Sequence, residues 1–184
     1  MECTIVNIFN FATNEFTQDA MISWTVSLFK SEDAVVRSVG RTFIEELISG
    51  SDKLDINSID DICIKMQKFN IDVLLEIELR NSDTELLLIE DNTYSKEYYE
   101  QIDNFRDKLI EEYRSSPIHA VYYKIGTELN AELNFKDRDI QVIDRKKIIC
   151  IFEKLDNMSK TKPENYLIRS YLEHVKEIEA TESA

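Results

Sequence analysis

The spacing of apolar residues predicts two long helices at the start of the chain. Apolar side chains recur at every fourth position from residue 14 to 29 and from 33 to 49, which is the period of one helix face. Thr13 is suited to cap the first helix, and Gly50 ends the second. A weaker pattern predicts a short helix over 56–67. The apolar positions are Phe16, Ala20, Trp24 and Leu28 in the first helix and Val35, Val39, Phe43 and Leu47 in the second.

After Phe69 the period changes from helical to alternating. Apolar residues alternate with mostly polar ones over 71–80, which predicts a strand. Residues 81–84 have the composition of a turn. The nearly continuous apolar run in 85–92 indicates a second strand, buried on both faces. We therefore expect these two strands to pair as a β-hairpin.

The remaining pattern adds three helices and one strand. A helix is predicted over 95–113, a third strand over 119–125, and helices over 145–155 and 164–178, with Pro163 near the start of the last. This order of elements predicts a layered α/β or α+β fold. The apolar face of the helix over 95–113 consists of Tyr98, Ile102, Phe105 and Leu109.

Length and charge limit the function classes. The chain has 184 residues, which fits one domain over 1–184 with a polar tail at 179–184; it either stands alone or forms the N-terminal part of a longer protein. It carries 36 acidic and 22 basic residues, a formal net charge of −14. Such a surface serves solubility and repels phosphate backbones and anionic membranes at long range. A nucleic-acid partner would therefore require a local basic patch or a bound metal ion.

Cysteine and histidine are too few and too scattered to indicate a zinc site. Cys3, Cys63 and Cys150 form no C-x-x-C motif, and the chain has only 2 histidines. We expect buried, reduced thiols in a cytoplasmic protein. No secretory signal is visible at the start, and no apolar stretch is long enough to span a bilayer, so no membrane partner is expected.

The feature with chemical content is a pair of acids in the predicted hairpin. Asp72 opens the first strand, and Glu90 follows four apolar residues near the end of the second. Charged residues are rare in central strands unless they are paired or bind metal. Two carboxylates brought together by a hairpin suit a hard divalent cation, which takes oxygen ligands. The alternative is that Asp72 lies in solvent at a strand edge and Glu90 caps the following loop.

Several stretches stand out in order along the chain. They are N-E-F-T-Q-D-A at 14–20, I-D-V-L-L at 71–75, I-E-D-N-T at 89–93, Y-E-Q-I at 99–102 and V-I-D-R at 142–145. In order and spacing they resemble the PD-(D/E)XK nuclease superfamily, specifically a bacterial subfamily with an acidic first helix, an I-D strand, an I-E-D-K-like strand end and a helix containing Gln. The likeness extends from about residue 9 to residue 172.

The resemblance implies a restriction-endonuclease-like core, with a mixed central sheet flanked by helices and a metal-dependent phosphodiesterase site on the hairpin. Asp72 and Glu90 would bind Mg²⁺ or Mn²⁺, and the backbone carbonyl of Asp91 would be a third ligand. Glu15 would support the metal or a water, and Gln101 would border the site. The implied partner is nucleic acid, DNA rather than RNA, and a homodimer is one arrangement that would cut both strands.

Position 92 departs from the pattern, because Asn92 stands where the family has lysine. An amide can hydrogen-bond a phosphate oxygen but brings no positive charge. Three explanations remain: the domain binds nucleic acid or protein without cutting, another cation such as Lys96 or Arg80 takes over, or the asparagine is an introduced, inactivating substitution. A cluster of Arg138, Arg145, Lys146 and Lys147 is either a basic patch or simply a solvated helix start.

Overall fold

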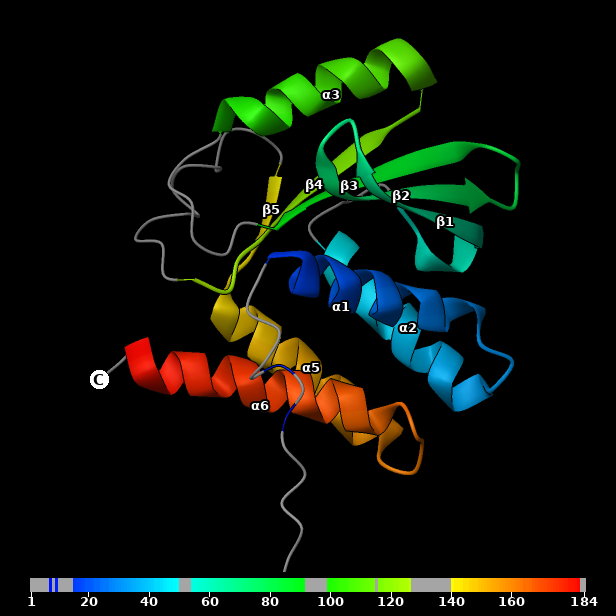
Figure 1. Ribbon diagram of the computed structural model, residues 1–184. Helices are drawn as coiled ribbons and strands as arrows, with labels where there is room; N and C mark the ends of the chain where they lie inside the picture. Colours follow the sequence, from blue (N-terminus) through cyan, green and yellow to red (C-terminus); the bar gives the residue numbers. More distant parts are fainter. Residues whose placement is uncertain are drawn as a thin grey trace, which may run out of the picture.

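The residues that the structure describes form a five-stranded mixed sheet with helices on both faces (Figure 1). This computed structural model describes residues 7, 9, 15–49, 54–91, 99–114, 116–126 and 140–182. The helices are α1 (Glu15–Ser27), α2 (Ala34–Ile48), α3 (Tyr99–Tyr113), α5 (Arg145–Ser159) and α6 (Asn165–Glu182), with short 3-10 turns at Leu28–Lys30 and Ile56–Ser58. The strands are β1 (Ile59–Lys68), β2 (Ile71–Leu79), β3 (Thr84–Asp91), β4 (Ile118–Tyr123) and β5 (Ile140–Ile143).

The strands lie side by side in their order along the chain. β1, β2 and β3 are antiparallel neighbours, whereas β4 runs parallel to β3 and β5 runs parallel to β4. The predicted hairpin is confirmed as β2 and β3, joined by a turn at 80–82, and the third predicted strand is confirmed as β4. The sheet is mixed because the crossover through α3 returns the chain to the end of the sheet where β3 begins, so that β4 runs parallel to β3.

One sequence prediction was wrong at a strand, and one strand was missed. Most of the short helix expected over 56–67 is instead β1, which pairs along its length with β2. Ile59 and Ile62 are three residues apart and both buried, a spacing that imitates a helix face although the segment is extended. β5 was not predicted at all, because four residues carry too little pattern to be recognised. Both are edge strands that acquire their conformation by pairing with a neighbour.

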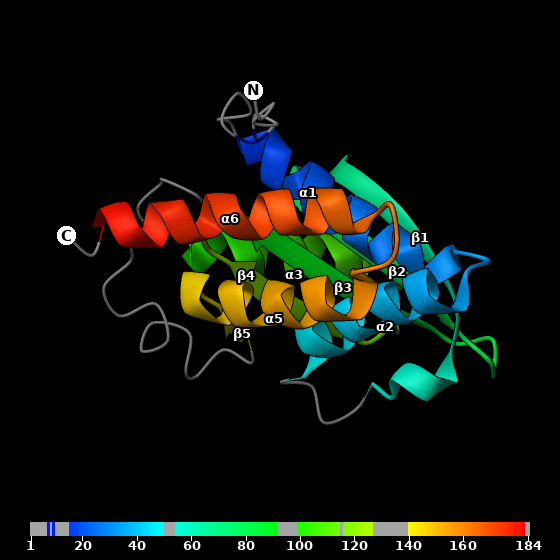
Figure 2. The ribbon, with the colours of Figure 1, turned by 90° about the horizontal axis from the view of Figure 1, so that it is seen from below.

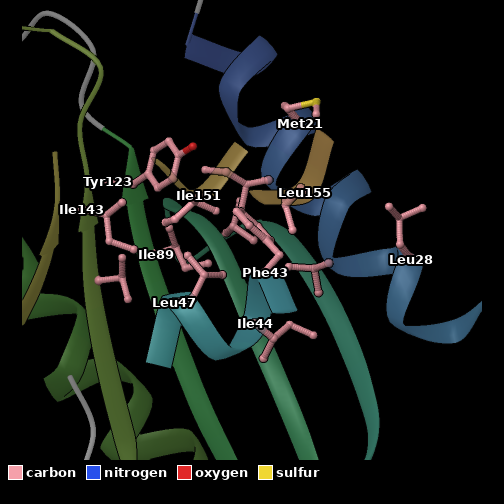
Figure 3. Packing of buried hydrophobic residues seen from close by; sticks show 14 of the residues in the cluster. Met21, Leu28, Phe43, Ile44, Leu47, Ile89, Tyr123, Ile143, Ile151 and Leu155 are labelled. Carbon is pink, nitrogen blue, oxygen red and sulfur yellow. The ribbon is translucent and has the colours of Figure 1, made fainter. Parts of the chain in front are cut away.

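The helices divide between the two faces of the sheet. α3 covers one face, and α1 and α2 lie against the other, with the antiparallel pair α5 and α6 packed below them (Figures 1 and 2). The larger hydrophobic cluster fills the space between the sheet and these four helices (Figure 3). Within it, Phe43 of α2 meets Phe152 of α5 edge to face, with ring centroids 5.7 Å apart. The smaller cluster lies under α3.

Helix positions agree with the sequence better than helix faces do. Val39, Phe43 and Leu47 are fully buried as expected, but Val35 is 38% exposed and Ala20 is exposed. α1 instead buries Met21, Ile22 and Val26 together with polar residues, so its inner face is rotated from the predicted stripe. The expectation of buried thiols was wrong for Cys63 and Cys150, which are exposed; Cys3 lies outside the described residues. Among the described helices, none is both long and apolar enough to cross a bilayer.

Candidate functional site

Polar residues gather at one end of the sheet. β1, β3 and β4 end there and β2 begins there, since β2 runs antiparallel to β1 and β3 while β4 runs parallel to β3. Five polar residues at this end are buried, each no more than 6% exposed, within a core that is otherwise mostly apolar. They are Gln18 and Asp19 of α1, Glu90 and Asp91 of β3, and Lys124 just after β4.

Asp72 is fixed by two hydrogen bonds where β2 begins. The backbone N–H of Asp91 donates to Asp72 Oδ2 at 2.9 Å, and the side-chain amide of Gln67 donates to Asp72 Oδ1 at 3.2 Å. The same amide nitrogen of Gln67 donates to Asp19 Oδ2 at 3.1 Å. Gln67 therefore links the acid of β2 to the acid of α1. The backbone of Gln67 has a positive φ of 56° next to the tight connection between β1 and β2.

The hairpin brings the two predicted acids to adjoining positions. Val73 is paired with Ile89 in the antiparallel register, so one further step places Asp72 opposite Glu90. Directly opposite residues in such a pair have Cβ atoms about 5 Å apart. Asp72 is half-buried and Glu90 is 6% exposed. The register brings the two residues side by side. That their carboxylates meet stays a prediction, because the Asp72 carboxylate is linked through Gln67 to Asp19 of α1.

Glu90 and Asp91 point to opposite faces of the sheet. Leu86 and Leu88 pack under α3, so the alternation of the strand directs Glu90 to the α3 side. Leu87 and Ile89 belong to the cluster beneath α1, so Asp91 points to that side. The two acids therefore do not form one carboxylate cluster, and any contribution of Asp91 next to Glu90 comes from its backbone.

Asp91 adjoins a buried pair of tyrosines. Burial raises the pKa of Tyr171 and of Tyr123 well above the ordinary value, and the nearby negative charge of Asp91 adds to both shifts. Both hydroxyls are therefore neutral. Their oxygens are 3.1 Å apart, and Tyr171 donates a hydrogen bond of 2.5 Å to Gln18 Oε1. This network joins α1, β4 and α6 behind the acidic end of the sheet.

Lys124 brings a positive charge to the same end. Its side chain is 5% exposed, and its Nζ lies 3.4 Å from the hydroxyl of Tyr122, which is the register partner of Glu90. Tyr122 packs on the α3 side of the sheet, so Lys124 and Glu90 share that face.

The other predicted site residues are placed only in part. Glu15 lies in the first turn of α1 and Gln101 in the first turn of α3, but the directions of their side chains are not described. Asn92 and Lys96 lie outside the described residues. Arg80 follows the far end of β2, eight residues or roughly 26 Å of strand from Asp72. It lines a separate cleft of about 390 Å³ beside α2 and cannot replace the missing lysine.

The contacts of Arg145 and Asp144 favour a helix start over a basic patch for this cluster. Arg145 is held by Glu179 and Glu182 of α6, each with an N···O distance of 2.5 Å, so its charge is locally neutralised. Asp144, from the V-I-D-R stretch, caps α5 by accepting a hydrogen bond of 2.8 Å from Lys147 N. This stretch therefore serves the start of a helix. Arg138 lies outside the described residues.

Sequence reasoning overlooked three residues of this site. Asp19 stands within the N-E-F-T-Q-D-A stretch, but Glu15 was chosen from it instead. Lys124 directly follows an apolar strand, which is the same signal that identified Glu90. Gln67 gave no signal, because the segment that contains it resembled a helix.

The described residues contain no group of three or more His, Cys, Asp or Glu side chains arranged to hold a metal ion. Comparisons of the chain with family models, with curated proteins and with solved structures found no match.

Proposed function

We propose that the protein is a metal-dependent nuclease that hydrolyses phosphodiester bonds in DNA at the acidic end of the sheet. The observation that carries the proposal is the position of Asp72, which backbone register places opposite the buried Glu90 and which the amide of Asp91 holds there. The mixed sheet with this acidic hairpin agrees with the resemblance to PD-(D/E)XK nucleases, and we propose a restriction-endonuclease-like core on that basis.

The donor set fits a hard divalent cation held by two carboxylates. Mg²⁺ keeps several waters and is commonly bound through one or two carboxylates together with substrate phosphates, so a preformed cluster of three acids is not required. Asp72 and Glu90 would hold the ion. When bound, Mg²⁺ or Mn²⁺ would lower the pKa of water and stabilise negative charge on a phosphate.

The residues of the chain would then have separate tasks. Asp72 is oriented by the amides of Asp91 and Gln67, so it need not lose side-chain freedom when the substrate arrives. Gln67 also ties this acid to Asp19, which keeps α1 close to the start of β2. The acidic surface repels DNA at long range, and a bound cation would offset part of that repulsion where the phosphate enters.

The alternative is a domain of the same fold that binds nucleic acid or protein without cutting. Asn92 favours it, since loss of a cationic stabiliser commonly costs on the order of a hundredfold in rate. The buried acids Glu90 and Asp91 favour catalysis, because burial of a carboxylate is costly and a domain released from catalysis need not keep it.

A cleavage assay with Mn²⁺ on plasmid and single-stranded DNA tests the proposal. We expect the wild-type chain, or at least its Asn92→Lys variant, to cut, and Asp72→Asn to lose about a hundredfold or more of that rate. Glu85→Gln is the matched control, because Glu85 is also a buried acid of β3 but lies at the other end of the strand. If neither the wild type nor Asn92→Lys cuts faster than Asp72→Asn, the nuclease proposal is wrong.

A further inference from the structure

We infer that Lys124 supplies the positive charge that contacts the scissile phosphate, the role that the sequence pattern assigns to position 92. The inference rests on the proposed nuclease function and identifies the phosphate-binding group of that site.

The burial of Lys124 is the first observation. Its side chain is 5% exposed, and it is the one Lys or Arg buried to this degree in the part of the chain that the structure describes. Lysine is almost never fully buried unless its charge is compensated, because removing an ammonium group from water is costly. Glu90 supplies a negative charge on the same face of the sheet, because it is the register partner of Tyr122.

The direction of the side chain is the second observation. The backbone N–H of Lys124 donates to the carbonyl of Ile143 at 2.9 Å, so the chain still runs beside β5 after the last residue of β4. Its Nζ lies 3.4 Å from the hydroxyl of Tyr122 and 5.8 Å from the centre of that ring. The ammonium group is therefore on the α3 side of the sheet, with Tyr122.

The relation to Glu90 is the third observation. Tyr122 is the register partner of Glu90 across the parallel strands β3 and β4, and neighbouring strands lie about 4.8 Å apart. Lys124 follows Tyr122 by two residues, which is the same step by which the lysine position of the family follows its glutamate. The cation is thus provided by the adjacent strand at the equivalent level of the sheet.

The chemistry of lysine suits this place. An ammonium group is a compact charge with three donors, whereas Asn92 offers an amide without charge. A fixed cation on the same face as Glu90 would hold a phosphate oxygen and stabilise the additional negative charge that develops during hydrolysis. The opposing interpretation is that Lys124 only neutralises the buried acids and stabilises the fold.

The test compares Lys124→Met with Lys68→Met. Lys68 is at the same end of the sheet but is bound to Glu112 and Tyr113 of α3, so it is a matched lysine outside the site. Cleavage of plasmid DNA with saturating Mn²⁺ is measured for both, together with Asn92→Lys/Lys124→Met. Binding of a fluorescein-labelled single-stranded oligonucleotide in Ca²⁺ and thermal melting are recorded for every variant. Lys124→Arg, which keeps the charge, replaces Lys124→Met if that variant does not fold.

We expect Lys124→Met to lose about a hundredfold in kcat, with Lys68→Met close to wild type. A lysine at position 92 should restore most of the lost rate, which a purely structural role of Lys124 would not allow. Lys124→Arg should keep a substantial part of the wild-type rate, and equality with Asp72→Asn would overturn the inference. So would a wild-type rate in Lys124→Met, or a loss that Asn92→Lys does not restore.

If the wild type cuts no faster than Asp72→Asn, the nuclease proposal fails separately and the oligonucleotide decides the role of Lys124. If Lys124→Met binds the oligonucleotide about tenfold more weakly than Lys68→Met does, the phosphate contact is supported. Equal affinities of the two variants would overturn it.

Discussion

The backbone N–H of Asp91, the last residue of β3, donates a hydrogen bond of 2.9 Å to Oδ2 of Asp72, the second residue of β2. A side chain thereby joins the two strands one step beyond Val73 and Ile89, the last residues that pair in the ladder. The position of the acid is fixed by the backbone of its neighbour, and the geometry of the site is consequently coupled to the stability of the hairpin.

This coupling predicts different effects for two substitutions of Asp72. Asp72→Ala leaves the amide of Asp91 without its acceptor and should lower the free energy of unfolding by about 1–3 kcal/mol. Asp72→Asn keeps one acceptor oxygen and should cost clearly less. Urea denaturation measures both, with Asp107→Ala on the exposed side of α3 as the control. Equal losses for Asp72→Ala and Asp107→Ala would show that the hydrogen bond contributes nothing.

Gly40 is required by the contact between α2 and the 3-10 turn after α1. A Cβ at this position would lie 2.2 Å from the backbone N of Phe29 and 2.6 Å from the carbonyl carbon of Leu28. Gly40→Ala should therefore destabilise the protein by about 1–3 kcal/mol or more, although alanine is the better helix former by about 1 kcal/mol. Thermal melting beside Val35→Ala, an exposed position of the same helix, is the measurement. A rise in Tm for Gly40→Ala would contradict the packing.

The hydroxyl of Tyr171 connects three elements behind the acidic end of the sheet. It donates to Gln18 Oε1 at 2.5 Å and lies 3.1 Å from the hydroxyl of Tyr123. Tyr171→Phe should cost about 1–3 kcal/mol, because buried polar groups of two residues lose a partner. Tyr166→Phe, 46% exposed on the same helix, should cost almost nothing in the same denaturation experiment. Indistinguishable unfolding curves for the two variants would exclude the network as a stabilising feature.

His174 predicts how stability depends on pH. Burial lowers the pKa of His174, and the carboxylate of Glu177 opposes this only in part. As the pH falls, the unfolded chain therefore binds a proton at His174 before the folded protein does. The stability that comes from keeping His174 neutral is complete above the ordinary histidine pKa of about 6.5, and it is lost as the pH falls through the pKa of the folded state. The free energy of unfolding between pH 7.5 and 5.5 should decline less steeply in His174→Asn than in the wild type. Parallel curves would contradict the assignment.

The central hairpin could be predicted because local and global signals agree in it. The alternation over 71–80, the polar turn and the apolar run over 85–92 all indicate two buried strands, and β2 and β3 form as expected. β1 could not be predicted in this way. It is an edge strand in which most residues are exposed or half-buried, so its apolar spacing carries little information and its pairing with β2 determines its conformation.

The same distinction applies to the candidate site. Asp72 and Glu90 were identifiable because each interrupts or borders an apolar strand in a recognisable order. Asp19, Gln67 and Lys124 come from α1, the end of β1 and the segment after β4, and only the folded sheet brings them to one end. The sequence also does not show which face of the sheet each side chain occupies. In the fold, the alternation of β3 directs Glu90 to the α3 side and Asp91 to the α1 side.

Binding of Mn²⁺ tests the central claim most directly, because it does not depend on whether Asn92 allows turnover. Titration followed by the electron paramagnetic resonance of free Mn²⁺ should show one site in the wild type that is lost or strongly weakened in Glu90→Gln. The site should persist in Glu85→Gln, which neutralises another buried acid of the same strand. Equal Mn²⁺ binding by the wild type and Glu90→Gln, or none by either, would contradict a metal site between Asp72 and Glu90.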